Sequence, residues 1–327
     1  MLRKIRIISI NVRGIKSKRA SLQDVFHQTR PDIALIQETN LKENEIVMIK
    51  EYKCLPLPRN NKGGGGLCAY VRKEVAHMVS EIKVDDEIQW LRIESRRKIM
   101  VANFYGLQES DPVKNVAALY EKLAMQTQQM KTDGDVIILG DFNSKINIPG
   151  SQNQSRNGEI MRAMTNACNL TIINESPLCK GTWTRVQGKK KSMIDYVVCS
   201  EPLVENVSSM VIDDVGHYKL VGKKPTDHNT IIVNLEHIEY SHTDSTPTAK
   251  FWWQIGEKTD WEQFRTEFNR RWSPDPEMKA ETQYQLWEEA VIKAGHVAVG
   301  RRQTKSRNRA SKNLKTARQA RNTIKKK

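Results

Sequence analysis

Hydrophobic residues in the first part of the chain occur mainly in short apolar runs, which predict buried strands. The β-branched run at residues 5–12 predicts the first strand, and the run at 33–37, ending just before Glu38, predicts the second. Similar runs predict further strands at 67–73, 89–94, 99–105, 136–139, 170–173, 193–199 and 231–235. Helices are expected only at about 21–29, 112–130 and 161–168. So many strands with so few helices argue against a doubly wound parallel sheet. They favour an α/β protein in which two mixed sheets pack face to face with helices outside.

The pattern changes after residue 238. Residues 239–258 are polar, without periodicity, and predict a linker. Residues 259–300 predict a helical connector in which aromatic and apolar side chains recur at helical spacing. These side chains form two stripes, Trp261, Phe264, Phe268 and Trp272, and then Tyr284, Trp287, Val291 and Ala294. Packing against another helix is the plainer interpretation of the stripes, and a base-stacking platform is the alternative.

Charge is distributed unevenly. The net charge is +15, and the predicted tail at 301–327 carries 12 Lys or Arg with no Asp or Glu, so that the rest of the chain is left at about +3. Such a block binds phosphate without regard to sequence, and a solvated tail or a nuclear-import signal has the same composition.

Two classes of protein are disfavoured by the sequence. The five cysteines are scattered without a CxxC pair, which argues against a disulfide framework or a structural zinc site. The apolar runs fall short of the roughly 18 residues that cross a bilayer, and Arg6 interrupts the one that resembles a signal peptide. No membrane association is expected.

Polar residues at the ends of predicted strands carry the candidate chemistry. They are Asn11, Glu38, Tyr105, Asp141 with Asn143, Asp195, and Asp227 with His228. Carboxylates that directly follow apolar strands are costly to desolvate unless they are paired or bind a metal. Oxygen ligands without a Cys–His cluster favour Mg²⁺, with Mn²⁺ as an alternative, over zinc.

The segments SINVRG, IQET, NFYG, ILGDFNS, SMIDYVV and TDHNTI contain these residues in order. With them the sequence resembles the endonuclease/exonuclease/phosphatase superfamily, which includes DNase I and the exonuclease III-type abasic-site endonucleases, over about residues 4–236. The resemblance implies a DNase I-like four-layer sandwich, assigned to residues 1–238, and a metal-dependent phosphodiesterase.

The resemblance also implies roles for the individual residues. Glu38 would be the main metal carboxylate, with Asn11 beside it and Asp227 as a further ligand. Asp141 would position or deprotonate the attacking water, and Asn143 would orient that water and the phosphate. His228, held by Asp195, would donate to a phosphate oxygen, as would Tyr105; Asn11 is also expected near the phosphate.

Other interpretations of these motifs are weaker. The Asp195–His228 pair could belong to a serine-hydrolase triad, but no GxSxG motif accompanies it. The run Gly63–Gly66 could suggest a phosphate cradle, but no GK[ST] follows it. Arg13 lies where abasic-site repair enzymes carry an acidic residue, so one ligand or water contact is in doubt, and Arg13 could touch DNA phosphate instead.

Within the superfamily, the stretch from SRNGEIMRAMTNACNLTIIN through GTWTR to SMIDYVVCS resembles the endonucleases of LINE-like non-LTR retrotransposons. The expected activity is nicking of target DNA for target-primed reverse transcription, in the nucleus after synthesis in the cytoplasm, with element RNA as a further partner of the tail. The fold begins close to Met1 and no YxDD polymerase motif is present, so a fragment, a truncated copy or a stand-alone derivative is expected. An abasic-site repair endonuclease and an inactive nucleic-acid-binding derivative are the alternatives.

Overall fold

The computed structural model describes residues 2–59, 64–85, 87–147, 153–239, 260–275, 278 and 280–298. The chain divides into two compact units, residues 1–243 and 244–327. The predicted linker at 239–258, apart from Glu239, and the predicted basic tail at 301–327 lie outside the described residues, as does Gly63. The boundaries assigned to the linker, connector and tail therefore stay predictions.

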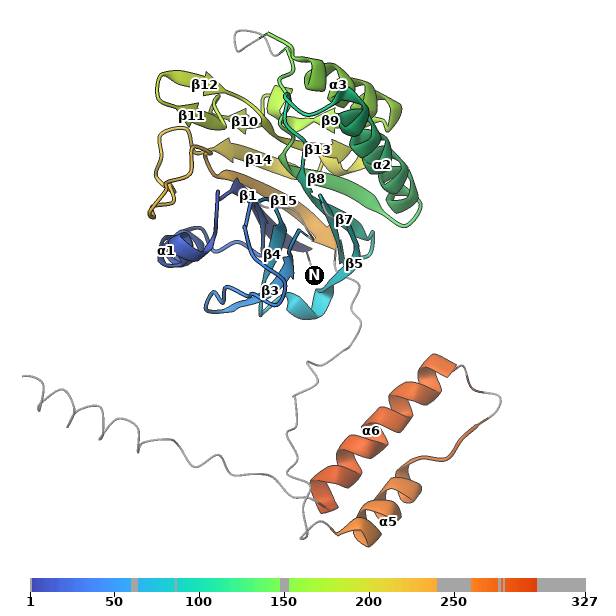
Figure 1. Cartoon of the computed structure of the whole chain (residues 1–327). Coiled ribbons are helices and arrows are strands. Elements are labelled where there is room, and N and C mark those ends of the chain that lie inside the picture. The colour runs from blue at the N-terminus through green and yellow to red at the C-terminus, as the bar shows by residue number, and fades with distance from the viewer. Residues whose placement is uncertain are drawn as a thin grey trace, which may run out of the picture. The chain divides into compact units, whose positions relative to one another are not determined.

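The first unit is built on two mixed β-sheets (Figure 1). The first sheet runs in the order β10 (Cys179–Lys180), β14 (Val207–Ile212), β15 (Ile231–Glu239), β1 (Leu2–Asn11), β2 (Ile33–Gln37), β4 (Leu67–Arg72) and β3 (Tyr52–Leu57). The second runs β5 (Val79–Asp85), β6 (Ile88–Ile93), β7 (Ile99–Tyr105), β8 (Asp135–Asp141), β13 (Asp195–Ser200) and β9 (Leu170–Ile172). Neighbours pair in parallel at β1–β2, β10–β14 and β7–β8, and are antiparallel elsewhere. A separate hairpin joins β11 (Arg185–Gln187) to β12 (Lys190–Ser192).

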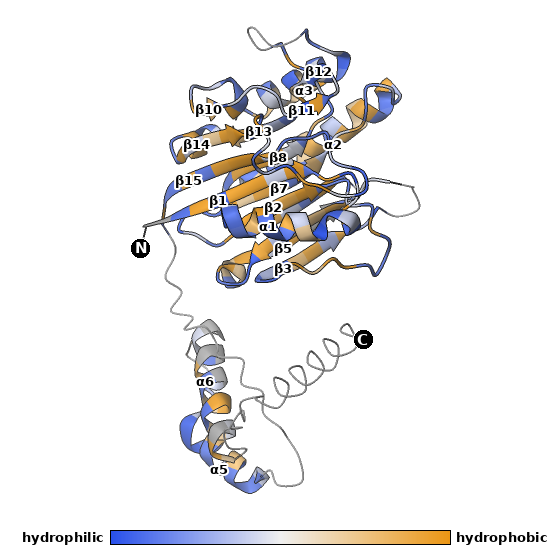
Figure 2. Ribbon diagram, turned by 90° about the vertical axis from the view of Figure 1, so that its left-hand side faces the viewer, coloured by the Kyte–Doolittle hydropathy of each residue, from blue (hydrophilic) through white to orange (hydrophobic). Residues whose placement is uncertain are grey.

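Helices cover the outer faces of both sheets and complete four layers. Alternate residues of β1 face opposite ways, so Ile7 enters the core between the sheets while Ile8 packs toward α1 (Arg19–Thr29). The outer face of the second sheet is covered by α2 (Val113–Lys131) and α3 (Arg156–Ala167), and the short α4 (Glu201–Val204) follows β13. The strands are largely apolar (Figure 2), as burial on both faces requires. The predicted α/β sandwich is confirmed.

Several elements differ from the sequence prediction. The helix expected at 161–168 begins at Arg156, because the Ser155 side chain caps it by accepting a hydrogen bond from Gly158 N (3.3 Å). The sequence does not predict strands β3, β5, β10 and β14 or the β11–β12 hairpin. These segments lie at or near sheet edges, where polar residues interrupt the apolar pattern.

A buried polar link joins the two sheets beneath one edge of the sandwich. Gln37, at the end of β2, donates from Nε2 to Asn103 Oδ1 on β7 (2.7 Å). Asn103 Nδ2 in turn donates to the backbone oxygen of Ile36 (3.3 Å). Because buried amides are stable only when they are hydrogen-bonded, this link fixes how the ends of β2 and β7 face each other.

Gly140 allows the parallel strands β7 and β8 to approach closely. Its φ is +153°, and an added Cβ would lie 1.9 Å from the Phe104 carbonyl oxygen. We expect Gly140→Ala to lower the free energy of unfolding by about 3 kcal/mol or more, because the contact is with backbone that cannot move aside. Denaturant unfolding would measure the loss.

Gly188→Ala provides the control, because its φ is +58° but an added Cβ meets nothing within 4 Å. We expect this variant to cost about 1 kcal/mol, from the left-handed backbone alone. Equal losses in the two variants would contradict the role assigned to the close approach at Gly140.

The second unit contains two packed helices, α5 (Trp261–Arg271) and α6 (Ala280–Ala298). Asp260 caps α5 by accepting a hydrogen bond from Gln263 N (2.9 Å). The first predicted aromatic stripe is present, with successive ring centroids 5.9, 6.1 and 5.5 Å apart in the order Trp261, Phe264, Phe268 and Trp272. A base-stacking role for it stays a prediction. None of the helices in the described part of the chain combines the length and apolar character needed to cross a membrane.

Candidate active site

The eight candidate residues converge at one edge of the sandwich. Asn11 and Asp141 are the last residues of β1 and β8, and Glu38 directly follows β2. In register, Asp141 lies beside Tyr105 on parallel β7 and beside Asp195 on antiparallel β13. The remaining three, Asn143, Asp227 and His228, lie in the loops that adjoin these strand ends. The topology therefore brings together every residue that the sequence singled out, although the catalytic and metal-binding roles stay predictions.

Asn11 connects the carboxylates of the two sheets. Its Nδ2 donates both to Glu38 Oε1 (2.8 Å) and to Asp141 Oδ2 (2.9 Å). Its Oδ1 accepts a hydrogen bond from Arg13 N (3.1 Å), and the side chain is completely buried. The amide is therefore fixed in orientation by three partners, and it sets the separation of the two acids.

Asp195 holds His228 against Asp141. The Nδ1 atom of His228 lies 2.9 and 3.0 Å from the two Asp195 carboxylate oxygens. The Nε2 atom is 3.8 Å from Asp141 Oδ2, which is beyond hydrogen-bond distance. All three side chains are buried, and the bond at Nδ1 leaves Nε2 free to act on a ligand.

The combined effect of burial and neighbouring charges is to raise the pKa values of both His228 and Asp141. Burial by itself lowers the pKa of His228, but the charges of Asp195 and Asp141 outweigh it and raise that pKa to about 9. Burial, together with the charge of Asp195, raises the pKa of Asp141 above its ordinary value. Near neutral pH the imidazole is therefore a cation, and Asp141 accepts a proton more readily than an ordinary aspartate.

Glu38 projects from a strained turn that several backbone contacts stabilise. Its φ is +51°, and its carbonyl accepts a hydrogen bond from Gly14 N (2.7 Å). The following residues are held by Gly65 and Gly66, whose carbonyls accept from Asn40 N and Thr39 N. The glycine run thus shapes the Glu38 loop, and nothing in Gly64–Gly66 indicates a phosphate cradle.

Tyr105 and Asn143 contact the acids rather than standing free. The Tyr105 hydroxyl donates to Glu38 Oε1 (2.9 Å). Burial, together with the Glu38 charge, raises the pKa of Tyr105 above its ordinary value, so the hydroxyl remains protonated. Asn143 N donates to Asp141 Oδ1 (2.9 Å), while its Nδ2 donates to the Gly106 carbonyl (2.8 Å). In this arrangement Tyr105 orients Glu38, and a direct donation from Tyr105 to phosphate stays a prediction.

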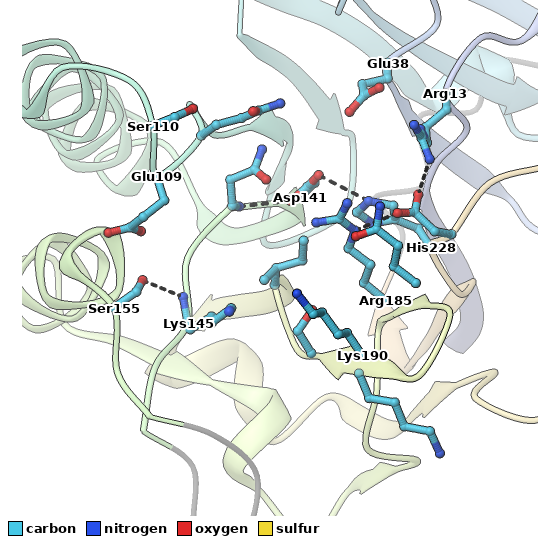
Figure 3. Close-up of a pocket in the computed structure, with 17 residues that line it drawn as sticks. Arg13, Glu38, Glu109, Ser110, Asp141, Lys145, Ser155, Arg185, Lys190 and His228 are labelled. Carbon is cyan, nitrogen blue, oxygen red and sulfur yellow. Dashed lines mark hydrogen bonds and ion pairs between the residues drawn. The ribbon is translucent and has the colours of Figure 1, made fainter.

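The site opens into a cleft of about 520 Å³ with a basic wall (Figure 3). Its floor carries Glu38, Asp141, Asn143, Asp227 and His228. Its cationic lining residues are Arg13, Lys145, Arg185, Lys190 and Lys191. Lys145 and the three cations of the β11–β12 hairpin were not singled out in the sequence. A Gly188–Lys189 turn between short segments is the signal that could have identified the hairpin.

The oxygen-rich centre fits a divalent metal ion. Both hydrogen bonds to the Glu38 carboxylate fall on Oε1, so that Oε2 accepts none from the described residues and is available to a ligand. Among the described residues, Asp141, Asp195 and His228 also have ligand atoms within 4.8 Å of one another. Glu38 Oε2 is the atom that we expect to bind the ion, and the ligand roles predicted for Asn11 and Asp227 stay predictions.

The fold and the acid–imidazole centre define a nuclease or phosphodiesterase. The sequence pattern of the endonuclease/exonuclease/phosphatase family matches residues 8–228, and the chain belongs to this family. No curated protein matches the chain by sequence.

Solved structures with the same fold include a retrotransposon endonuclease domain, an AP endonuclease and a 3′ phosphatase. The endonuclease domain of TRAS1, a telomere-specific non-LTR retrotransposon, is 19% identical with a TM-score of 0.58, and the match covers 72% of this chain and 99% of that one. The AP endonuclease of Leishmania major is 14% identical with a TM-score of 0.61, covering 72% and 88%. The Neisseria 3′ phosphatase NExo, bound to a product DNA hairpin, is 13% identical with a TM-score of 0.57, covering 71% and 99%. At these identities the likeness establishes the fold alone.

Proposed function

We propose that this chain is a Mg²⁺-dependent DNA endonuclease that nicks one strand of intact duplex for target-primed reverse transcription by a non-LTR retrotransposon, acting in the nucleus. The observation that carries the nuclease part is the buried Asp195–His228–Asp141 group beside Glu38, on the floor of a cleft with five cationic side chains. The likeness to the TRAS1 domain supports the retrotransposon part.

The chemistry follows from the positions of the side chains. Asp141 accepts the proton of the attacking water, and its raised pKa suits it to that task. The His228 imidazolium donates from Nε2 to a non-bridging phosphate oxygen, where negative charge increases in the transition state. When bound at Glu38, a Mg²⁺ ion would supply further positive charge at the phosphate. The cationic lining holds the DNA backbone in the cleft.

An abasic-site repair endonuclease is the second candidate, and the likeness to the Leishmania major enzyme supports it. The presence of Arg13, where repair enzymes carry an acidic residue, weighs against it. The two proposals differ in substrate, because a repair enzyme requires a missing base and a retrotransposon endonuclease cuts intact duplex.

The test is a comparison of three substrates with purified protein in Mg²⁺: supercoiled plasmid, an abasic oligonucleotide duplex and an inositol phosphate. We expect nicked plasmid whose ends a DNA polymerase extends directly, since the proposed product is a 3′-hydroxyl. EDTA should abolish nicking, and excess Mg²⁺ or Mn²⁺ should restore it. Cleavage confined to the abasic duplex would favour the repair enzyme. DNA binding without cleavage of any substrate would favour an inactive binding derivative.

A further inference from the structure

The carboxylate of Asp227 is shared between two arginines on the cleft wall. Arg13 Nη1 lies 3.1 Å from Asp227 Oδ1, and Arg185 Nε lies 2.8 Å from Asp227 Oδ2. The Asp227 side chain is only 9% exposed, whereas those of Arg13 and Arg185 are 47% and 33% exposed and line the cleft. Burial alone would raise the pKa of Asp227, but the Arg185 hydrogen bond and the neighbouring cations hold it below its ordinary value.

Backbone contacts fix Arg185 to the segment that carries the catalytic imidazole. Val186 N donates to the Asp227 carbonyl (2.7 Å), and Arg185 forms an isolated bridge with His228. Asn229 N donates to the Thr184 carbonyl (2.7 Å) on the other side of that bridge. The base of the β11–β12 hairpin and the Asp227–His228 pair therefore form one unit, in which the Arg185 guanidinium pairs with the Asp227 carboxylate.

A buried lysine fixes the loop that carries Arg13. The Lys18 side chain is completely buried, and its Nζ donates to the carbonyls of Arg13 (3.0 Å) and Gly14 (3.2 Å). Burial and the nearby Arg13 charge lower the pKa of Lys18, whereas the Glu38 charge opposes them. Arg13 itself has a φ of +45°, which a loop without such contacts would not favour. The buried Lys18 amine therefore stabilises the turn at Arg13 and Gly14.

The net charge of Asp227 and its two arginines favours binding of an anion over binding of a further cation. One carboxylate facing two guanidinium groups leaves a net charge of +1, and both of its oxygens are already engaged. A guanidinium presents five N–H donors in a planar fork, so each arginine retains donors for a ligand in the cleft. Phosphodiester oxygens match this geometry, whereas a divalent ion at Asp227 would lie beside two fixed positive charges.

We propose that Arg13 and Arg185, aligned by Asp227, form a binding site for a backbone phosphate of the nucleic acid next to the scissile one, and that Asp227 does not bind the catalytic metal. Lys18 acts as a positioning residue for Arg13. This inference rests on the proposed function insofar as the ligand is DNA. It gives Arg13 a role as a cationic replacement for the acidic residue of the repair enzymes.

DNA binding in EDTA tests the site without any cleavage. The affinity of the full chain for intact duplex is measured over a range of salt concentrations. Arg13→Gln should reduce the slope of log Kd against log salt by about 1, the effect of losing one phosphate contact. Lys16→Gln is the matched control, since Lys16 lies three positions away, is paired with Glu45 and does not line the cleft. Equal slopes for Arg13→Gln and wild type would overturn the proposal, as would equal reductions in the two variants.

Metal-binding measurements test the second part of the proposal, that Asp227 does not bind the metal ion. Calorimetry with Mn²⁺ alone should show at least a tenfold loss of affinity in Glu38→Gln and less than a twofold change in Asp227→Asn. A loss in Asp227→Asn that matches Glu38→Gln would overturn the assignment of Asp227. Wild-type protein that fails to nick DNA in Mg²⁺ would instead overturn the proposed function, so the two failures are distinguishable.

Lys18→Met tests the positioning role. We expect it to reproduce the reduced salt slope of Arg13→Gln, because the turn is no longer held by its two carbonyls. Thermal unfolding of the same sample reports on the fold. A lower Tm with an unchanged salt slope would mean that Lys18 serves stability alone, and the positioning role would be overturned.

Discussion

Replacing Asp141 by asparagine is expected to lower the rate of DNA nicking by about 10³-fold or more, within the range that general-base catalysis supplies, while the protein stays folded. The side chain is 1% exposed and keeps hydrogen bonds from Asn11 and from Asn143 N. Asparagine has nearly the same shape, but its single side-chain oxygen can accept only one of these bonds, because they fall on different oxygens of Asp141, and it cannot take a proton from water. Single-turnover nicking rates with excess enzyme would measure the loss of the chemical step.

Asp135→Asn is the matched control, because Asp135 is the first residue of the strand that ends at Asp141 and lies about 20 Å away at strand geometry. It pairs with Arg97 and is absent from the cleft lining. We expect this variant to nick DNA at nearly the wild-type rate. Thermal unfolding of Asp141→Asn should give a Tm close to that of wild type, because removal of a buried charge offsets the one hydrogen bond that is lost. An Asp141→Asn rate within tenfold of wild type would rule out the role assigned to this acid.

Changes at His228 and Asp195 are expected to be large and not additive. His228→Gln should reduce nicking by about 10²- to 10³-fold, the usual cost of one preorganised donor to a developing anion. Asp195→Asn should also nick DNA more slowly, because the Asp195 carboxylate orients His228 Nδ1 and stabilises the imidazolium. The double variant should be no slower than His228→Gln alone, since the two residues act as one unit.

The pH dependence of the Asp195→Asn variant separates charge from geometry. The pKa of His228 is raised to about 9, so the cation is present below that pH and is lost as pH rises through it. Nicking by the wild type should therefore fall above about pH 9. Removing the Asp195 charge lowers this pKa, so the fall should move to lower pH. Unchanged alkaline profiles, or full additivity in the double variant, would contradict the proposed pair. His27→Gln on the exposed surface of α1 controls for loss of an imidazole elsewhere.

The interior of the sandwich could be predicted from sequence because burial on both faces leaves continuous apolar runs. Residues 33–37 and 99–105 were predicted with the bounds that β2 and β7 have. The edge strand β3 was not predicted, because it contains Pro56 and because most residues of Tyr52–Leu57 are only partly buried, without a clear apolar pattern. The β11–β12 hairpin carries no apolar signal, because its side chains face the cleft and solvent.

The chemical centre could also be predicted, but its surroundings could not. Acids and amides at strand ends can be recognised in the sequence because each directly follows an apolar run. The topology brings these residues together at one edge of the sandwich. Nothing local marks Arg185 as a partner of Asp227, because their contact spans 42 positions of sequence. Lys18 is equally inconspicuous in KSKRA, since only the folded loop shows that it is buried. Such residues depend on tertiary packing, which single-sequence patterns do not encode.

The amide of Asn11 bridges two carboxylates that belong to different sheets, and this has a consequence for folding intermediates. Each sheet carries about half of the catalytic set: Asn11, Glu38 and His228 adjoin the first, and Tyr105, Asp141 and Asp195 belong to the second. A collapsed state with native secondary structure but loosened packing would thus be catalytically silent, because sliding of one sheet by even an ångström parts the acids from their donors. Under the proposed function, activity would therefore begin only when the two sheets have docked, and cleavage would be confined to fully folded molecules.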